Sequence, residues 1–345
     1  RTCNQLRMFA TLVEEGSWVD ACIDTAIPDR SPVPKSDIRK MNMAIGPVVV
    51  FTASNFPLAF STAGGDTASA LAAGCPVVLK AHESHLGTNS LVASAVCQAA
   101  EKTGMPDGVF SSLNGDGYTT GASLVKHPLT QAVAFTGSFR GGKALFDLAN
   151  QRPRPIPVFA EMGSINPVFL LPEFLKYKAE TIAGLIASSV TLGAGQFCTN
   201  PGIIVVEDNQ DTQNFNSCLK NSFAQIQAAT MLNKGIFDNY LLEKSKNLAE
   251  RGVALEFEDA SKSGGIKARA TVASVAAGEF ISNSSLHREV FGPFTLVVKC
   301  CGKEEMTKVA TAFEGQLTAS VFGQTEELKE HTHLIDVLQE KVGRL

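Results

Sequence analysis

The feature that most constrains the fold is a repeating unit between residues 46 and 171, in which a short apolar run is followed by a turn and a helix-forming stretch. The apolar runs are GPVVVF (46–51), CPVVLK (75–80), GVFSSL (108–113), QAVAFT (131–136) and IPVFAE (156–161). The stretches rich in alanine, leucine and small residues are 58–74, 86–104 and 141–150. Short apolar strands that alternate with helices are typical of a parallel sheet covered by helices. The sequence therefore predicts an α/β fold with a doubly wound parallel sheet.

The pattern changes after SINPVFLLP (164–172), which predicts a second domain. The elements expected there are a long helix over about 177–192, a strand at 202–207, helices near 210–228 and 239–251, strands at 294–300 and 317–323, and a final helix. We expect the domains to cover residues 1–162 and 163–345. A helix pattern is already running at residue 1, and EKVGRL stops where another strand could begin. We therefore expect that the first domain lacks an N-terminal part and the second a C-terminal part.

Composition narrows the choice of partners. The chain has 345 residues, 44% of them hydrophobic, and a net charge of -4 without a basic stripe. This argues against nucleic acid or a membrane surface as the main partner and favours a small molecule. No apolar run is long enough to span a bilayer. The eight cysteines form no CxxC pair, which suits a reducing compartment, and we expect a cytoplasmic protein without a metal site; His82 and His85 are the nearest approach to one.

Ligands of open parallel sheets bind at the carboxyl ends of the strands, so the residues that follow each run are candidate site residues. Asn55 could donate an amide hydrogen bond or simply form a turn. Lys80 could hold ribose or phosphate oxygens or be a surface lysine. Gly137 and Ser138 lead into a helix whose backbone N–H groups could bind phosphate, although FTGSFRGG does not match the GxGxxG fingerprint. Burial would raise the pKa of Glu161 toward that of a general base; the alternative is a cap or a salt bridge.

Cys198 lies in GAGQFCTNPG (193–202), between two glycine-containing turns. Taken alone, a cysteine is more often a buried inert side chain than a nucleophile. Together with Glu161, however, it supplies what a covalent mechanism through a thioester needs: a thiol that attacks and a carboxylate that activates water.

The motifs SNFP, VVLK, FTGS, AEMGSINP, GQFCTNPG and EVFGPF, in this order, resemble the aldehyde dehydrogenase superfamily over nearly the whole chain. Within it, the chain most resembles the NADP-type 2-oxoglutarate semialdehyde (2,5-dioxopentanoate) dehydrogenases. The resemblance implies a cofactor-binding domain over residues 1–162 and a catalytic domain over 163–345. It also implies a homo-oligomer, a dimer or tetramer, if the protein is full length.

The resemblance implies the NAD(P)-dependent oxidation of an aldehyde to a carboxylic acid. Cys198 would attack the aldehyde to give a thiohemiacetal, and loss of hydride would give a thioester. Asn55 and the backbone N–H of Cys198 would stabilise the oxyanion, and Glu161 would activate the water that hydrolyses the thioester.

The resemblance also assigns the contacts of the cofactor, NADP or NAD. Lys80 would bind the adenosine ribose, and Gly137 with Ser138 would lie at the pyrophosphate. Glu289 and Phe291 of EVFGPF would contact the nicotinamide ribose and ring, although Glu289 could also be a surface carboxylate.

Gly142 and Glu83 are the remaining residues that the resemblance concerns. Gly142 fits the second glycine of the family's glycine motif and would permit close helix packing. Glu83 stands where NADP-using relatives usually have a small or hydroxyl residue. Because a carboxylate accepts from ribose hydroxyls and repels a 2′-phosphate, we expect dual or NAD-leaning use.

Three alternatives remain at this stage. Phe56, Phe197 and Phe291 could line a pocket for a fatty or other aliphatic aldehyde. Coenzyme A or phosphate could replace water as the acyl acceptor, although Glu161 argues for hydrolysis. The chain could also be an inactive truncated fragment that binds a dinucleotide.

Overall fold

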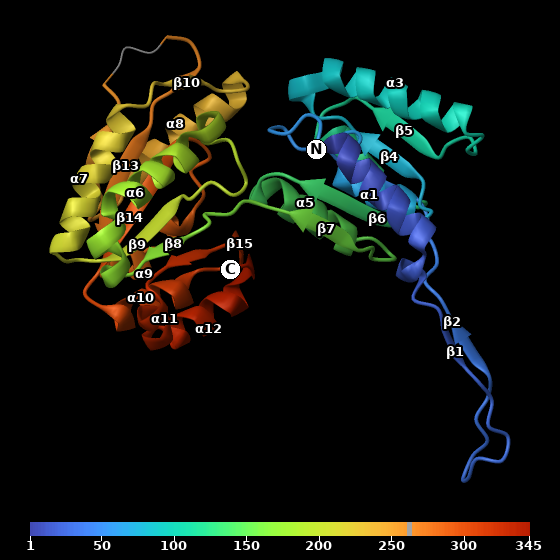
Figure 1. The fold of residues 1–345 in the computed structure, drawn as a ribbon. Helices are drawn as coiled ribbons and strands as arrows, with labels where there is room; N and C mark the ends of the chain where they lie inside the picture. The colour runs from blue at the N-terminus through green and yellow to red at the C-terminus, as the bar shows by residue number, and fades with distance from the viewer. Residues whose placement is uncertain (261–263) are drawn as a thin grey trace. The chain divides into compact units, whose positions relative to one another are not determined.

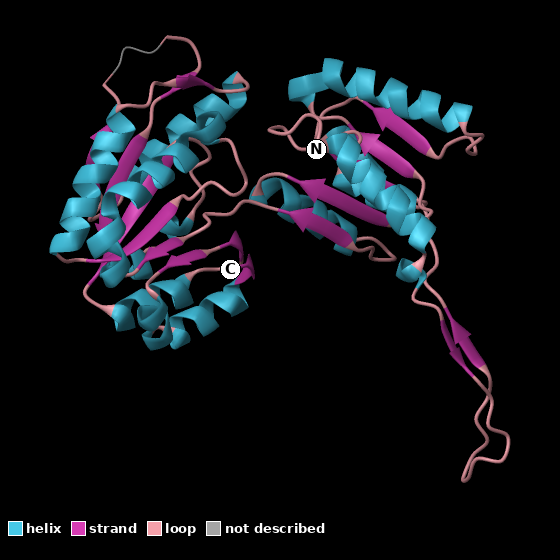
Figure 2. Cartoon of the chain, in the orientation of Figure 1, coloured by secondary structure: helices cyan, strands magenta, loops and turns pink. Residues whose placement is uncertain are grey.

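The computed structural model describes residues 1–260 and 264–345, which form two compact units, Arg1–Met162 and Gly163–Leu345 (Figure 1). Each unit combines strands with helices (Figure 2), which confirms the predicted α/β class. Among the described residues, no helix has the length and apolar character needed to cross a membrane. The eight cysteines, all of which lie among the described residues, form no disulfide.

The first unit is built on a five-stranded parallel sheet in the order β5-β4-β3-β6-β7. Its strands are β3 (Val48–Phe51), β4 (Val77–Lys80), β5 (Phe110–Leu113), β6 (Ala132–Thr136) and β7 (Val158–Glu161). Phe51 on the central strand β3 lies opposite Lys80 on β4 and opposite Phe135 on β6. The five apolar runs are thus confirmed as strands. Because the strands are parallel, their carboxyl ends share one edge of the sheet.

Both faces of this sheet are covered by helices. The helices are α2 (Gly65–Ala72), α3 (Leu86–Lys102), α4 (Thr119–Lys126) and α5 (Phe139–Asn150). Successive side chains of a strand point to opposite faces. Val48 and Val50 accordingly lie in one apolar cluster with side chains of α2 and α3, whereas Val49 and Phe51 lie in another with side chains of α4 and α5. The sheet is therefore doubly wound.

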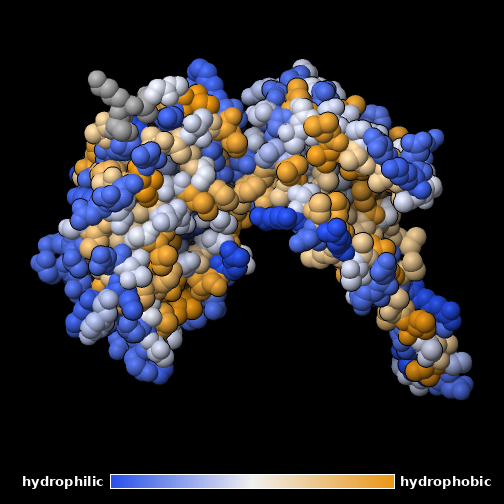
Figure 3. Space-filling view, turned by 45° about the horizontal axis from the view of Figure 1, so that its top comes forward, coloured by the Kyte–Doolittle hydropathy of each residue, from blue (hydrophilic) through white to orange (hydrophobic). Residues whose placement is uncertain are grey.

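The first unit also contains a helix and a hairpin outside this sheet. These are α1 (Thr2–Glu15), the 3₁₀ turn η1 (Ser17–Val19) and the antiparallel strands β1 (Cys22–Asp24) and β2 (Ile38–Lys40). Ile23 and Ile38 of the hairpin are 66% and 58% exposed. Figure 3 shows orange, hydrophobic residues among blue ones on this segment.

The second unit is built on a six-stranded sheet in the order β11-β13-β14-β9-β8-β16, in which only β11 is antiparallel to its neighbour. Its strands are β8 (Val168–Leu170), β9 (Ile203–Glu207), β11 (Ala254–Glu258), β13 (Thr271–Ala276), β14 (Phe294–Cys300) and β16 (Ser320–Phe322). Two short pairs join β10 (Ala229–Thr230) with β12 (Lys267–Ala268) and β15 (Gln316–Thr318) with β17 (Val342–Arg344).

Helices cover both faces of this second sheet as well. The helices of this unit are α6 (Pro172–Thr191), α7 (Gln210–Ala224), α8 (Lys234–Ala249), α9 (Ala277–Ser282), α10 (Lys303–Ala312), α11 (Thr325–Glu330) and α12 (Thr332–Lys341). Two 3₁₀ turns, η3 (Leu192–Gly195) and η4 (Ser284–His287), also belong to it, whereas the turn η2 (Glu83–His85) belongs to the first unit. Ile204 and Val206 of β9 share a cluster with α6 and α7. Ile203 and Val205 share another with α8, α9, α10 and α12.

The structure differs from the sequence prediction in several boundaries. The helix expected over 58–74 begins only at Gly65, because residues 57–64 form turns. The long helix begins at Pro172 rather than 177, and proline at the first helical position fits its missing N–H. The run 317–323 is divided between β15 and β16, which belong to different sheets. Helix α4 and strands β11 and β13 had not been expected.

A charged network ties β11 to its neighbours. Glu256 on β11 ion-pairs with Lys220 of α7 at 2.5 Å and with Lys299 of β14 at 3.3 Å, and it accepts a hydrogen bond of 2.8 Å from Ser274 of β13. Burial raises the pKa of Glu256, but the hydrogen bonds from Lys220, Ser274 and Lys299 outweigh it and hold the pKa at about 2. The carboxylate form is therefore favoured in the folded state.

We predict that Glu256→Gln lowers the free energy of unfolding at pH 7 by about 1–2 kcal/mol. The expected effect is modest because Lys220 and Lys299 are partly exposed and water screens their charges. Because the folded pKa lies below the ordinary 4.5, this stabilisation is complete above pH 4.5 and is lost as the pH falls through about 2. Urea unfolding at pH 7 and pH 3 should show a difference that shrinks by about half at pH 3. The exposed Glu326→Gln is the control, with an effect below about 0.5 kcal/mol; a pH-independent effect of Glu256→Gln would contradict the prediction.

Candidate functional site

The candidate residues of the first unit gather at the carboxyl edge of its sheet. The chain passes from β3 to β4 and β5 on one side and then returns to β6 and β7 on the other. Such a reversal is the switch point at which open α/β sheets bind ligands. Asn55 follows β3, Lys80 ends β4, Gly137 and Ser138 follow β6, and Glu161 ends β7. The topology thus brings these five residues to the same edge.

Lys80 is a buried cation at this edge. Its side chain is 7% exposed, and its Nζ lies 3.6 Å from Oε1 of Glu83, which is 61% exposed. Burial, followed by the charges of His85 and Lys80, lowers the pKa of His82 to about 4, so this imidazole is neutral at pH 7. The His82 ring stacks on His85 at 5.7 Å. Within the residues that the structure describes, no group of three His, Cys, Asp or Glu side chains is arranged to hold a metal ion.

The turn between β6 and α5 requires glycine at two positions. Ser138 caps α5, its Oγ accepting a 3.2 Å hydrogen bond from the N–H of Gly141. A Cβ on Gly137 would lie 2.7 Å from Cζ of Phe135, and one on Gly142 would lie 2.6 Å from Cγ of Met162. Side chains at these glycines would collide with their neighbours. The helix N-terminus therefore presents backbone N–H groups in a turn that only small residues can form.

Glu161 has an acidic neighbour that the sequence analysis missed. Asp66 stands in the first turn of α2, and burial, followed by the charge of Glu161, raises the pKa of Asp66. The backbone carbonyl of Glu161 accepts a 3.0 Å hydrogen bond from the N–H of Gly137. Asp66 and Glu161 together make this part of the edge acidic. The signal in the sequence was the acidic residue of GGDT at a helix start.

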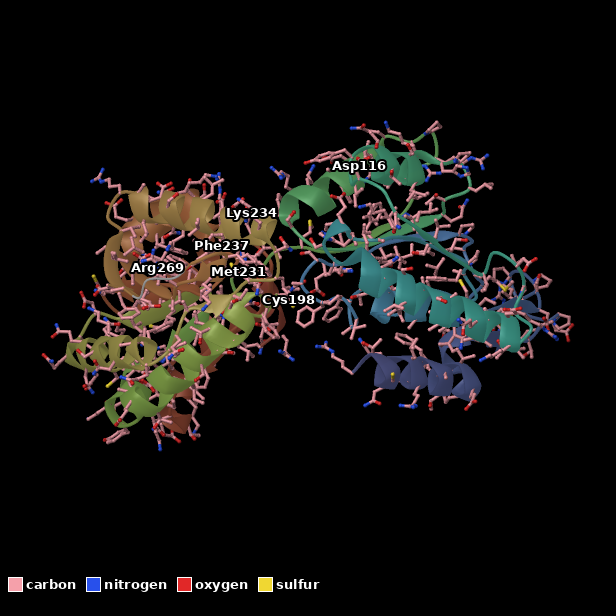
Figure 4. All side chains as sticks on the ribbon, turned by 90° about the horizontal axis from the view of Figure 1, so that it is seen from above. Asp116, Cys198, Met231, Lys234, Phe237 and Arg269 are labelled. Atoms are coloured by element: carbon pink, nitrogen blue, oxygen red, sulfur yellow. The ribbon has the colours of Figure 1, made fainter. Side chains whose placement is uncertain are left out.

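In the second unit, Cys198 lies on a loop between α6 and β9 that we call the Cys198 loop (193–202). The loop begins with three consecutive residues in the left-handed region: Gly193 at φ 56°, Ala194 at φ 56° and Gly195 at φ 69°. Leu232 donates its N–H to Oε1 of Gln196 at 3.0 Å, which links the loop to the segment after β10. Figure 4 labels Cys198 and Met231, the neighbour of Leu232. Cys198 itself is partly buried.

The Cys198 loop is bound to the EVFGPF motif. Asn200 donates from Nδ2 to the carbonyl oxygen of Gly292 at 2.8 Å and to that of Gly195 at 3.3 Å. A Cβ on Gly195 would lie 2.2 Å from the carbonyl carbon of Gly292, so the two backbones are in direct contact. The structure thus brings Cys198 and the loop of Glu289 and Phe291 into one part of the second unit.

Asn166 holds the same loop from the other side. Its Nδ2 donates to the carbonyl oxygens of Cys198, at 2.8 Å, and of Asn200, at 2.9 Å. No role had been predicted for Asn166 or Asn200 from the sequence. Both precede a proline, and an Asn-Pro pair marks a turn, which was the only local signal available.

Glu289 is a carboxyl group in a dry environment. Burial raises its pKa to about 7, and the hydrogen bond from the backbone N–H of Ser164 opposes this shift. A Cβ on Gly163 would lie 2.4 Å from Oε2 of Glu289, so the carboxyl group packs directly on this glycine. Glu289 is therefore not the surface carboxylate of the alternative interpretation. It packs against the backbone of Gly163 and Ser164, and its raised pKa favours the protonated form more than for an ordinary glutamate.

The second unit also has a cavity that the Cys198 loop does not line. It has a volume of about 440 Å³ and is lined by Glu207, Lys303 and His331 among others. Glu207 is the last residue of β9, whereas the Cys198 loop precedes the first. The cavity therefore lies at the opposite end of β9 from the Cys198 loop.

Comparison with known proteins agrees with the motifs. The model of the aldehyde dehydrogenase family matches residues 1–339. The chain is 48% identical over its full length to alpha-ketoglutaric semialdehyde dehydrogenase 2 of Azospirillum brasilense and 41% identical to alpha-ketoglutaric semialdehyde dehydrogenase of Acinetobacter baylyi. It spans 66% and 65% of the lengths of these relatives.

Solved structures share the fold at lower identity. A betaine aldehyde dehydrogenase from Staphylococcus aureus in complex with NAD+ superposes with a TM-score of 0.78 at 21% identity, covering 98% of this chain and 64% of that one. An NAD-dependent benzaldehyde dehydrogenase from Corynebacterium glutamicum gives 0.76 at 21% identity, covering 99% and 72%. These matches confirm the predicted fold.

We predict that Gly195→Ala lowers the free energy of unfolding of the protein by about 2 kcal/mol or more, because a Cβ at φ 69° would be strained and would collide with Gly292. Thermal or urea unfolding measures this effect. Gly184→Ala in α6 is the matched control, since a Cβ there meets nothing within 4 Å. It should be neutral or stabilising by up to about 1 kcal/mol. Equal stability of the two variants would show that the contact with Gly292 is unimportant.

Proposed function

This chain belongs to the aldehyde dehydrogenase family, and on that premise we propose that it oxidises an aldehyde to a carboxylic acid with NAD or NADP. The observation that carries the proposal is the conformation of the Cys198 loop. Its thiol is partly buried, and its backbone is held by the side chains of two asparagines, Asn166 and Asn200. A loop held in this way favours a positioned nucleophile over an inert core cysteine.

In the proposed reaction Cys198 attacks the carbonyl carbon of the aldehyde, and the adduct is a thiohemiacetal. The negative charge that develops on the carbonyl oxygen needs preorganised donors. We assign the backbone N–H of Cys198 and the side-chain amide of Asn55 to this role. Loss of hydride from the adduct leaves a thioester on Cys198.

The residues assigned to the cofactor have the chemistry that a dinucleotide needs. Lys80 offers a buried ammonium group for ribose or phosphate oxygens, and Ser138 with Gly137 offers a helix N-terminus for the pyrophosphate. Gly142 keeps α5 close to Met162. Glu289, whose burial favours a hydrogen-bonded partner, would accept from the nicotinamide ribose, and Phe291 would contact the ring. When bound, the nicotinamide accepts the hydride.

Glu161 is proposed as the base that activates water for hydrolysis of the thioester. Asp66, whose pKa is raised by burial and by the charge of Glu161, is the second carboxyl group of this part of the site. Hydrolysis also accounts for a carboxylic acid product, whereas acyl transfer to coenzyme A or phosphate would leave this carboxylate without a task.

The substrate we propose is 2-oxoglutarate semialdehyde, supported by the names of relatives that are 48% and 41% identical over the whole of this chain. An aliphatic aldehyde is the second candidate, because Phe56, Phe197 and Phe291 stand beside the motifs. We further propose that the protein acts in the cytoplasm, as its eight free thiols suggest, and as a homo-oligomer.

We predict that the purified protein oxidises 2-oxoglutarate semialdehyde with a higher kcat/KM than a long-chain aldehyde. Cys198→Ser should lower turnover by roughly a thousandfold, because it removes the thiolate. Glu161→Gln should keep a first burst of reduced cofactor and lose the steady state, because hydride leaves before hydrolysis. Rates are followed by the absorbance of the reduced cofactor. Folded protein that binds a dinucleotide but oxidises none of a broad panel of aldehydes would contradict the proposal and favour a non-catalytic fragment.

We also predict the direction of cofactor choice. Glu83 next to Lys80 should favour NAD, since its carboxylate repels a 2′-phosphate. Glu83→Ser should therefore raise the ratio of kcat/KM for NADP to that for NAD by about tenfold, the equivalent of one modest charge interaction. Glu101→Ser, an exposed substitution near the end of α3, is the control and should leave the ratio unchanged. A wild-type enzyme with strong NADP preference that is insensitive to Glu83 would contradict this.

A further inference from the structure

The carboxamide of Asn166 connects two points of the Cys198 loop. It lies just before β8, is 3% exposed, and donates both of its protons to backbone carbonyl oxygens, of Cys198 at 2.8 Å and of Asn200 at 2.9 Å. An NH₂ group has two donors, and its two short hydrogen bonds both go to this loop. A third contact, to the carbonyl oxygen of Ser164, is longer at 3.5 Å. Residue 199 lies between the two anchored carbonyl groups.

We propose that Asn166 is a positioning residue that sets the backbone conformation at Cys198 for its reaction, an inference that rests on the proposed function. The anchored carbonyl of Cys198 restricts rotation about the bond between its Cα and carbonyl carbon. The second anchor, at Asn200, restricts the chain two residues farther on. The orientation of the Cys198 side chain and of its N–H, the proposed oxyanion donor, follows from this backbone.

The other end of the carboxamide is held as well. Its Oδ1 accepts hydrogen bonds from Oγ1 of Thr318 at 3.1 Å and from Oγ of Ser164 at 2.9 Å. A rotated amide would direct this oxygen at the carbonyl oxygens of Cys198 and Asn200, which can only accept. These two carbonyl groups therefore fix which end of the Asn166 amide meets the loop.

The backbone of Asn166 gives a second reason to regard this position as specialised. Its φ is +42°, in the left-handed region that few residues other than glycine adopt. The following residue is Pro167, which restricts the preceding backbone further. Such a conformation persists where the surroundings hold it, and five hydrogen bonds to one side chain do so. Glycine can adopt this φ without the amide, so Asn166→Gly separates the two effects.

The test compares Asn166→Gly with two controls in the intact protein. Thr318→Val removes one donor to Oδ1 and leaves both bonds to the loop. Asn89→Ala removes an equally buried asparagine of the first unit, which is 2% exposed and bonds Thr62 and Ser112. The readouts are kcat and KM for the aldehyde, hydrogen exchange of a peptide that covers the Cys198 loop, and the urea midpoint.

We expect Asn166→Gly to lower kcat by about tenfold to a hundredfold, the equivalent of two lost hydrogen bonds, with KM for the aldehyde changed by less than about threefold. Hydrogen exchange should become faster in the Cys198 loop and stay unchanged in α6. Thr318→Val should lower kcat by less than about threefold, and Asn89→Ala should leave kcat and loop exchange unaltered.

Two results would overturn the proposal. One is wild-type kcat and loop exchange in Asn166→Gly. The other is faster exchange throughout the second unit with a matching fall in the urea midpoint, which would make Asn166 a general structural residue. If the wild-type protein oxidises no aldehyde, the proposed function fails, but the exchange measurement still decides whether Asn166 orders the loop.

Discussion

Hydrogen bonds from asparagine side chains to backbone carbonyl groups hold the Cys198 loop in place, and the proposed reaction at Cys198 depends on them. The Cys198 loop lies between a long helix and a buried strand, and part of it runs through three left-handed residues that cannot belong to either. A loop of this kind has few backbone partners of its own. Asn166 and Asn200 supply the missing donors, so the backbone that carries Cys198 is held by neutral amides.

Three titratable groups, Asp66 and His82 of the first unit and Glu289 of the second, show what burial does without full compensation. Glu289 is raised to about 7, Asp66 is raised and His82 is lowered to about 4, in each case chiefly by loss of water. All three shifts favour the neutral form. Groups of this kind change their charge when a polar ligand replaces the water they have lost, which is why perturbed pKa values gather at binding sites.

The sequence allowed the strands of the first sheet and the residues at their ends to be predicted, because apolar runs and turn residues are local signals. Lys80 and Glu161 are the last residues of β4 and β7 as expected. Helix α4 and strands β11 and β13 were missed because their patterns are short or mixed. The role of Asn166 could not be foreseen, since its partners lie 32 and 34 residues away and no periodicity relates them. The burial of Glu289 likewise depends on packing against Gly163, which is distant in the chain.

The span of the contacts around Asn166 has a consequence for how the protein folds. Ser164 and Asn166 are bonded to Gln316 and Thr318, more than 150 residues later, while the loop itself is bonded to Gly292. Contacts between such distant segments form only after long stretches of chain have closed, and closure of this kind slows folding. We therefore expect the backbone around Cys198 to reach its native geometry late in folding, when the chain around it is already compact.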